Sequence, residues 1–263
     1  MDLGLQSKVA LVAAASRGLG RAVAYELAKE GAKVIIFARG REAIQAARDE
    51  IASSTGADVH AIVADITDDD HIARVVAEST SRFGPIDILV TNAGGPPAGP
   101  FEAHKWDAWE RAVQLTLKGA VELTRAVLPS MRERRWGRII HVTSIAVKQP
   151  VDNLMLSNSL RSAVTGFART LANEVATDGV TVNCIMPGYT RTERVEELAD
   201  ATAKRDGLTR EDVLKRFERE IPMKRLGEPH EFAAMAAFLA SDRASYVTAQ
   251  SIAVDGGWIR SLL

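Results

Sequence analysis

Three side chains in the middle of the chain could act together on a bound molecule. Ser144 ends the largely apolar stretch GRIIHVTS, and Ser157 and Arg161 follow in a region with helical periodicity. Positions four residues apart lie on one face of a helix, so the Ser157 hydroxyl and the Arg161 guanidinium can reach the same ligand. An arginine stays protonated and an unactivated serine is a poor acid, so neither suits proton transfer near neutral pH.

A second candidate site is the turn at residues 14–20, which reads AASRGLG. It follows an apolar run and precedes a segment with apolar residues at helical spacing, so strand, turn and helix succeed one another. Helix N-termini bind phosphates because their N–H groups are unpaired, and glycines let the backbone approach the ligand. Close packing of helix on strand is the alternative explanation for the glycines. The turn predicts a nucleotide site with these contacts: Ser16, Arg17, Gly18, Leu19 and Gly20.

The residue that ends the second apolar run indicates which nucleotide binds. An NAD site would place an acidic residue there to bond the ribose hydroxyls, but this chain has Arg39. A guanidinium at that point, together with Arg17, suits a 2′-phosphate. NADP(H) is therefore preferred over NAD(H), with a pair of solvated arginines as the alternative.

The elements that position these residues alternate between short apolar strands and helices. This alternation predicts a doubly wound, Rossmann-like α/β fold. We expect a single domain, residues 1–263, around a parallel sheet of about seven strands. The expected strands are residues 8–13, 33–38, 58–63, 87–91, 137–143, 180–185 and 251–254, and helices are expected after residue 20 and over 41–52, 68–82, 106–135, 158–176 and 228–240. The charged segment from residue 187 to about 219 is expected to be irregular, and residues 190–220 form a candidate lid.

Composition excludes several classes of function. Of the 263 residues, 46% are hydrophobic and 25% are charged, and the net charge is −1. Such a chain can bury a sizeable core and has no general attraction to nucleic acid or an anionic membrane. The single cysteine, Cys184, excludes an internal disulfide, and no apolar run is long enough for a leader or a membrane span. We expect a cytoplasmic protein without a metal site, since no HExxH or CxxC motif occurs.

SRGLG at residues 16–20, Asn92-Ala93-Gly94 and Pro187-Gly188 together resemble the short-chain dehydrogenase/reductase family, above all its β-ketoacyl-acyl-carrier-protein reductases. The resemblance runs from residue 4 to VDGGW at 254–258 and includes LPSM and IPMKRLGEP. It implies an NADP(H)-dependent oxidoreductase for a small-molecule carbonyl, secondary alcohol or acyl thioester, and a homotetramer or dimer. It also implies these further cofactor contacts: Asp65, Ile66, Asn92, Ala93, Gly94, Arg161, Pro187, Gly188 and Thr190.

The chain departs from the family pattern at functional positions. The first glycine of the family's cofactor turn is Ala14, whose methyl narrows the turn and disfavours a positive φ, so nucleotide binding is expected to be weakened. Of the family's catalytic Ser, Tyr, Lys and Asn, only the serine remains, as Ser144. The other three positions hold Ser157, Arg161 and Thr116. Loss of a general acid or base typically slows a reaction about 10²–10⁴-fold without forbidding it.

Two functions therefore stay open. The first is a 3-oxoacyl-reductase-like enzyme with an atypical proton path, and the second is a nucleotide-binding sensor, regulator or subunit without turnover. Tyr189, the phenol nearest to the expected nicotinamide, is a substitute proton donor or, more simply, part of the pocket wall. The basic turn RERRWGR at residues 132–138 could dock an acyl carrier protein, although a solvated turn explains it equally.

Overall fold

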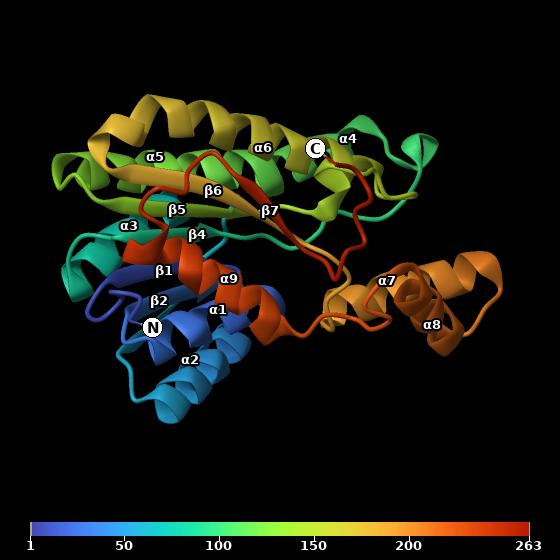
Figure 1. The fold of residues 1–263 in the computed structure, drawn as a ribbon, viewed down its shortest axis with the longest axis horizontal. Helices are drawn as coiled ribbons and strands as arrows, with labels where there is room; N and C mark the ends of the chain where they lie inside the picture. Colours follow the sequence, from blue (N-terminus) through green and yellow to red (C-terminus); the bar gives the residue numbers. More distant parts are fainter. Residues whose placement is uncertain (1, 263) are drawn as a thin grey trace.

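A seven-stranded parallel sheet forms the centre of the computed structural model, which describes residues 2–262 (Figure 1). The strand order β3-β2-β1-β4-β5-β6-β7 means that the chain moves outward to β3 and then returns to the other side of β1. This reversal creates a crevice at the carboxyl ends of β1 and β4, and the predicted doubly wound fold is confirmed. The strands are β1 Val9–Ala13, β2 Lys33–Ala38, β3 Val59–Val63, β4 Ile88–Thr91, β5 Gly137–Val142, β6 Val180–Pro187 and β7 Ser251–Val254.

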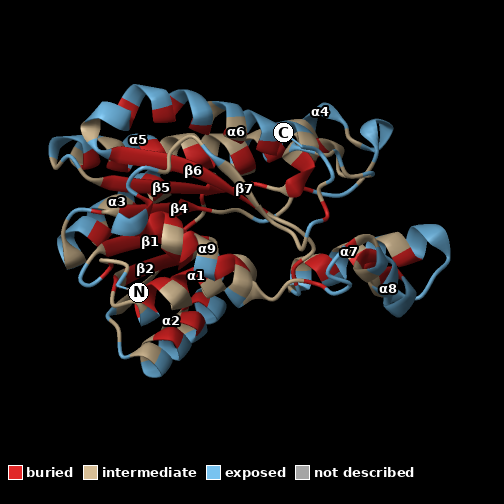
Figure 2. Ribbon diagram, in the orientation of Figure 1, coloured by how far each residue is buried: buried red, intermediate tan, exposed pale blue. Residues whose placement is uncertain are grey.

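Helices cover both faces of the sheet (Figures 1 and 2). Helices α1, α2 and α9 pack with one hydrophobic cluster, whereas α3, α5 and α6 pack with the other. Among residues 2–262, no helix combines the length and apolar character needed to cross a bilayer. The helices are α1 Gly18–Lys29, α2 Arg41–Thr55, α3 Asp69–Phe83, α4 Trp106–Ala112, α5 Gly119–Glu133, α6 Met155–Val175, α7 Glu193–Asp206, α8 Arg210–Glu220 and α9 Pro229–Ala240.

Strand β1 shows why the central strands read as unbroken apolar runs. Ala10 and Val12 belong to the α1–α2–α9 cluster, and Val9, Leu11 and Ala13 belong to the opposite one. All five are buried because a parallel sheet with helices on both faces leaves neither face to solvent. A polar side chain is therefore excluded until the strand ends, which concentrates the functional groups in the loops.

The helix expected over residues 106–135 is interrupted. A π-helical segment, Val113–Lys118, separates α4 from α5. A π turn is a local feature inside an otherwise α-helical stretch, and the helical periodicity on each side of it is kept, so periodicity alone could not reveal it. Thr116, predicted as a catalytic position, lies in this segment.

The prediction of an irregular segment between residues 187 and 219 is wrong. Two helices, α7 and α8, form a hairpin that projects from one side of the domain (Figure 1). Gly207 ends α7 in the left-handed region at φ 68°, and the Thr209 side chain caps α8 by accepting a hydrogen bond from the Asp212 N–H. A few apolar residues, among them Val195 and Phe217, pack in a third cluster. Most of the hairpin sequence is charged, which concealed this narrow apolar stripe.

Candidate active site

One cavity of about 920 Å³ lies at the carboxyl ends of the strands. Residues that follow β1 to β6 contribute to its wall, as the strand order requires. All the predicted site residues line this cavity except Gly20 and Thr116. The sequence therefore identified one connected site from segments far apart in the chain.

The start of α1 is suited to a phosphate. Arg17 is the N-cap, no side chain caps the first N–H groups, and the first turn contains no acidic residue. Gly18 has φ 57°, a conformation that glycine adopts without strain. A Cβ on Gly20 would lie 2.5 Å from the Ala14 carbonyl oxygen, so Gly20 acts by allowing the helix to approach the turn. These features fit a dinucleotide, whose pyrophosphate the turn would hold.

Ala14 adopts a conformation that its side chain disfavours. Its φ is 49°, in the left-handed region, at the position where the family pattern has glycine. An L-residue with a Cβ loses about 1–2 kcal/mol there. The Asn92 side-chain amide donates a hydrogen bond of 3.5 Å to the Ala14 carbonyl, which ties the end of β4 to the turn. Ala14 therefore adopts a backbone conformation that glycine would adopt without strain.

One positive and one negative side chain line the cavity beyond the ends of β2 and β3. Arg39 is exposed directly after β2, and no acidic residue stands at the end of that strand. Asp65 follows β3, where its carboxylate accepts hydrogen bonds from the Thr67 N–H and hydroxyl. Both Arg39 and Asp65 line the cavity. The Arg39 guanidinium suits a phosphate better than it suits ribose hydroxyls.

Ser144, Ser157 and Arg161 lie on the same wall. The Ser144 hydroxyl accepts a hydrogen bond of 3.1 Å from the Ala146 N–H, which fixes its position after β5. Ser157 and Arg161 are buried one turn apart on α6. The Arg161 Nη1 donates to the carbonyls of Val142 and Thr143, both at 2.9 Å, so this end of the guanidinium is fixed against the sheet.

Thr116 does not reach the cavity. It is 6% exposed, and its hydroxyl has no hydrogen-bond partner among the described residues. The π-helical segment that carries it packs on α6, behind the wall formed by Ser157 and Arg161. A direct role for Thr116 in the site remains a prediction.

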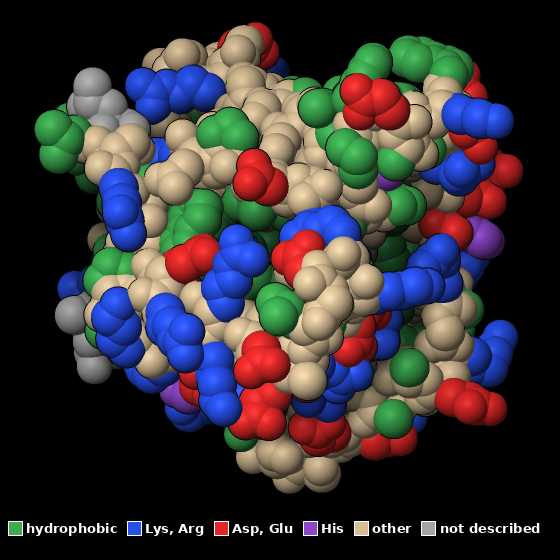
Figure 3. Space-filling view, turned by 90° about the vertical axis from the view of Figure 1, so that its right-hand side faces the viewer, with side chains coloured by type: hydrophobic (Ala, Val, Ile, Leu, Met, Phe, Trp, Pro, Cys, Tyr) green, Lys and Arg blue, Asp and Glu red, His purple; other side chains and the backbone are tan. Residues whose placement is uncertain are grey.

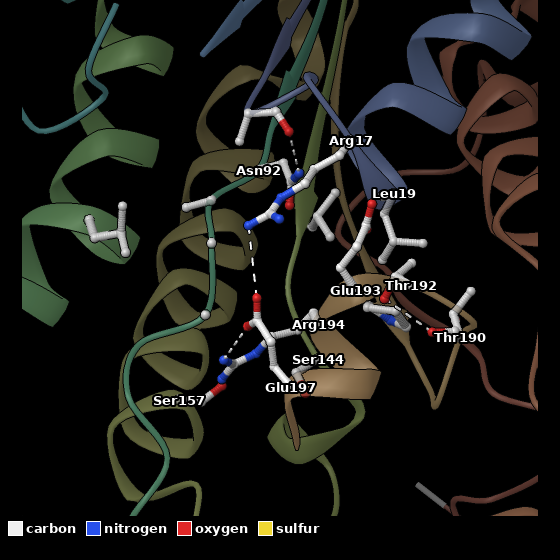
Figure 4. A pocket seen from close by; sticks show the side chains of 18 of the residues that line it. Arg17, Leu19, Asn92, Ser144, Ser157, Thr190, Thr192, Glu193, Arg194 and Glu197 are labelled. Atoms are coloured by element: carbon white, nitrogen blue, oxygen red, sulfur yellow. Dashed lines mark hydrogen bonds and ion pairs between the residues drawn. The ribbon is translucent and has the colours of Figure 1, made fainter. Parts of the chain in front are cut away.

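The structure adds residues that the sequence did not indicate. Thr192, Glu193, Arg194 and Glu197 line the cavity from the start of α7. Figure 4 shows Glu197 between two arginines, and its carboxylate lies 3.9 Å from Arg17 and 3.5 Å from Arg194. The preceding Pro187-Gly188 motif, which also lines the cavity, could have indicated that the next residues lie near the site. Because this segment was expected to be irregular, no helix face could be assigned to it from the sequence.

Comparison with known proteins shows the family to which the chain belongs. The family model described as "Enoyl-(Acyl carrier protein) reductase" matches residues 13–259. The chain belongs to the short-chain dehydrogenase/reductase family. It is 34% identical to the 3-oxoacyl-[acyl-carrier-protein] reductase FabG of Staphylococcus epidermidis over 252 residues, 95% of this chain and 98% of the relative. It is 36% identical to the oxidoreductase UcpA of Escherichia coli over 254 residues, 96% and 95% of the two chains. The L-sorbose reductase of Gluconobacter frateurii, solved with NADPH and L-sorbose, superposes with a TM-score of 0.94 at 34% identity over the whole of both chains.

In this member of the short-chain dehydrogenase/reductase family, Tyr189 is part of the wall. Its ring stacks on Phe217 with centroids 4.2 Å apart and meets Trp258 edge-on at 6.0 Å. Burial, with Glu220 nearby, raises the pKa of Tyr189 to about 12. A phenol held so firmly protonated is poorly suited to exchange a proton near neutral pH.

His141 and Cys184 belong to the core. His141 is fully buried in β5, and its Nδ1 lies 2.7 Å from the Thr91 hydroxyl. Burial lowers the pKa of His141 to about 4, so the ring is neutral at physiological pH. Burial likewise raises the pKa of Cys184 to about 11, which makes it a poor nucleophile.

The basic turn at residues 132–138 has structural partners. Arg132 pairs with Asp178 at 2.6 Å, Arg134 pairs with Asp87, and Arg138 is 3% exposed. The turn precedes β5, whereas the cavity lies at the other end of that strand, roughly 20 Å away for six residues. The side that α7 and α8 occupy shows basic and acidic side chains intermixed (Figure 3). Neither surface offers an acidic carrier protein a uniform basic patch.

The Ala14→Gly variant is expected to be more stable than the wild type by about 0.5–1 kcal/mol. The substitution removes about 1–2 kcal/mol of strain from the left-handed conformation of residue 14. It also costs about 0.4–1 kcal/mol of stability, because glycine raises the conformational entropy of the unfolded chain. Denaturant unfolding measures the difference. Ala15→Gly is the matched control: Ala15 is buried without a positive φ, so this variant should be destabilised. Destabilisation of both variants alike would contradict the assignment of strain to Ala14.

Proposed function

We propose that the protein is an NADP(H)-dependent oxidoreductase that interconverts a carbonyl and a secondary alcohol by an atypical proton path. One observation carries this proposal: a single cavity joins a phosphate-binding turn and Arg39 to Ser144, Ser157 and Arg161. The similarity to FabG and to an NADPH-bound sorbose reductase supports it. A 3-oxoacyl thioester is the first substrate to test. Three further statements stay predictions: that an acyl carrier protein carries this substrate, that the protein is a dimer or tetramer, and that it is cytoplasmic.

Bound nicotinamide would supply or accept the hydride. Gly18 and the start of α1 would hold the pyrophosphate of the dinucleotide, and Arg17 and Arg39 would hold its 2′-phosphate. Thr190 is the proposed contact of the nicotinamide carboxamide. Ser144, which the Ala146 N–H fixes in place, would orient the substrate oxygen.

The proton path must do without the usual phenol and ammonium pair. Arg161 cannot release its proton, although burial together with Arg194 lowers its pKa to about 10. The fixed charge of Arg161 would stabilise the negative charge that develops on the substrate oxygen. A water held by Ser144 and Ser157 would then deliver the proton. Turnover is expected to be slow, since the missing general acid is typically worth about 10²–10⁴-fold.

Arg39→Ala should weaken NADPH binding by about tenfold and leave NADH binding unchanged, because a charge-assisted contact with the 2′-phosphate is lost. Fluorescence titration with both nucleotides measures this. Arg41→Ala is the control, since Arg41 is exposed two positions away and does not line the cavity. Equal loss of affinity for NADPH and NADH would refute the assigned preference, and the absence of binding to either nucleotide would refute the enzyme itself.

Ser157→Ala should lower kcat for NADPH oxidation by about tenfold or more if Ser157 holds the proton-delivering water. Tyr189→Phe should retain turnover, because it keeps the ring that packs on Phe217 and removes only the hydroxyl. The reaction is followed with a 3-oxoacyl thioester at saturating NADPH. The reverse pattern, with Tyr189→Phe inactive and Ser157→Ala normal, would assign the proton to Tyr189.

The second candidate function is a nucleotide-binding sensor or regulatory subunit. The replaced catalytic positions favour it, and wild-type protein that binds NADPH without oxidising it would establish it. The double variant Ser157→Tyr/Arg161→Lys then shows whether the scaffold is otherwise competent. Turnover gained by this variant would mean that only the proton donor is missing.

A further inference from the structure

Two arginines line the same part of the cavity, and of these two only Arg194 has an acidic partner among the described residues, namely Glu197. Arg161 comes from α6 and Arg194 from α7, and both line the cavity wall near Ser144 and Ser157. Each guanidinium carries a full positive charge at physiological pH. The balance of charge at this end of the cavity therefore depends on what binds there.

Arg161 has no acidic partner. Within residues 2–262, no carboxylate oxygen lies within 4.0 Å of its guanidinium, which instead donates to the backbone carbonyls of Val142, at the end of β5, and of Thr143. It is 8% exposed. Burying an unpaired charge is costly, and the second cation, Arg194, disfavours the charged form further. An anion beside Arg161 would offset both effects.

Arg194 is held over the cavity with donors to spare. Its Nη2 donates to the Pro96 carbonyl at 3.0 Å, and its one acidic contact is the partly exposed Glu197 at 3.5 Å. Gly95 makes this position possible, because a Cβ there would lie 2.7 Å from the Nε and Nη2 atoms of Arg194. The guanidinium thus lies against the loop after β4, and Figure 4 shows it extending from α7.

We infer that the substrate carries a carboxylate beside its reacting carbonyl, and that Arg194 binds this carboxylate with the buried charge of Arg161 behind it. This inference rests on the proposed function and narrows its substrate to an oxo acid or hydroxy acid. A guanidinium fork matches a carboxylate in geometry as well as charge. The nucleotide's phosphates have their own site at the start of α1, with Arg17 and Arg39. Arg194 is therefore a specificity-determining residue that touches substrate.

The test is calorimetric titration of the protein saturated with NADP⁺, which cannot deliver a hydride to a carbonyl. The probes are acetate and 3-oxobutanoate, each beside its neutral amide. Carboxylates should bind more tightly than the amides, and Arg194→Gln should weaken carboxylate binding by about 10- to 100-fold while leaving the amides unaffected. Gly95→Ala should act in the same direction, because the added methyl displaces the guanidinium without removing its charge.

Arg191→Gln is the matched control. Arg191 lies three positions from Arg194, pairs with Glu228 at 3.1 Å and does not line the cavity. Carboxylates that bind no better than amides would overturn the inference, as would an Arg194→Gln protein with normal carboxylate binding. An equal loss of NADP⁺ and carboxylate affinity would assign Arg194 to the nucleotide instead. Repeating the titration without nucleotide keeps the outcome separate from the proposed function, which fails if NADPH does not bind.

Discussion

The reversal of strand order at β1 and β4 is the constraint on which the site depends. Strands buried on both faces consist mainly of apolar residues, so most of the groups that line the cavity come from the loops and helices beyond the strand ends. Parallel strands place all those ends on one edge, and the reversal opens that edge into a cavity. The glycine-containing turn after β1, Arg39 after β2 and Ser144 after β5 therefore line one cavity, although Ser144 lies more than 100 residues after the other two.

The sequence predicted most of the fold because the signals were local and repeated. Seven apolar runs became seven strands, and the cavity contains the turn, strand-end and helix residues expected of it. Ser157 and Arg161 share a helix face because a four-residue spacing fixes their relation before any tertiary contact forms. The family membership agrees with these same motifs.

Other features depended on information that periodicity does not hold. Thr116 lies in the π-helical segment Val113–Lys118, is buried, and is not among the residues that line the cavity. Helices α7 and α8 carry only a narrow apolar stripe, so their charge concealed them. Arg194 owes its role to a tertiary contact, namely the space that Gly95 leaves for its guanidinium. Such a contact cannot be read from spacing along one element.

Two positions at which the residue type departs from the family pattern combine a constrained backbone with a fixed charge. Ala14 retains a left-handed backbone at an energetic cost, and Arg161 retains a cation without a transferable proton. Ala14 keeps a positive φ but lacks the conformational freedom of glycine. Arg161 keeps a positive charge but cannot release a proton. With a fixed cation in place of a proton donor, binding and orientation are the main sources of rate enhancement that these residues can supply.

Glu197 has one further consequence. Because its carboxylate pairs with both Arg17 and Arg194, a phosphate that takes Arg17 leaves Glu197 free to pair more closely with Arg194. Binding beside Arg17 would therefore be linked to binding beside Arg194. If the nucleotide changes the affinity for a second ligand by some factor, that ligand must change the affinity for the nucleotide by the same factor. Both ion pairs are long and solvent-exposed, and such pairs are typically worth less than about 1 kcal/mol. The coupling should stay below about fivefold, enough to bias the order of binding without enforcing it.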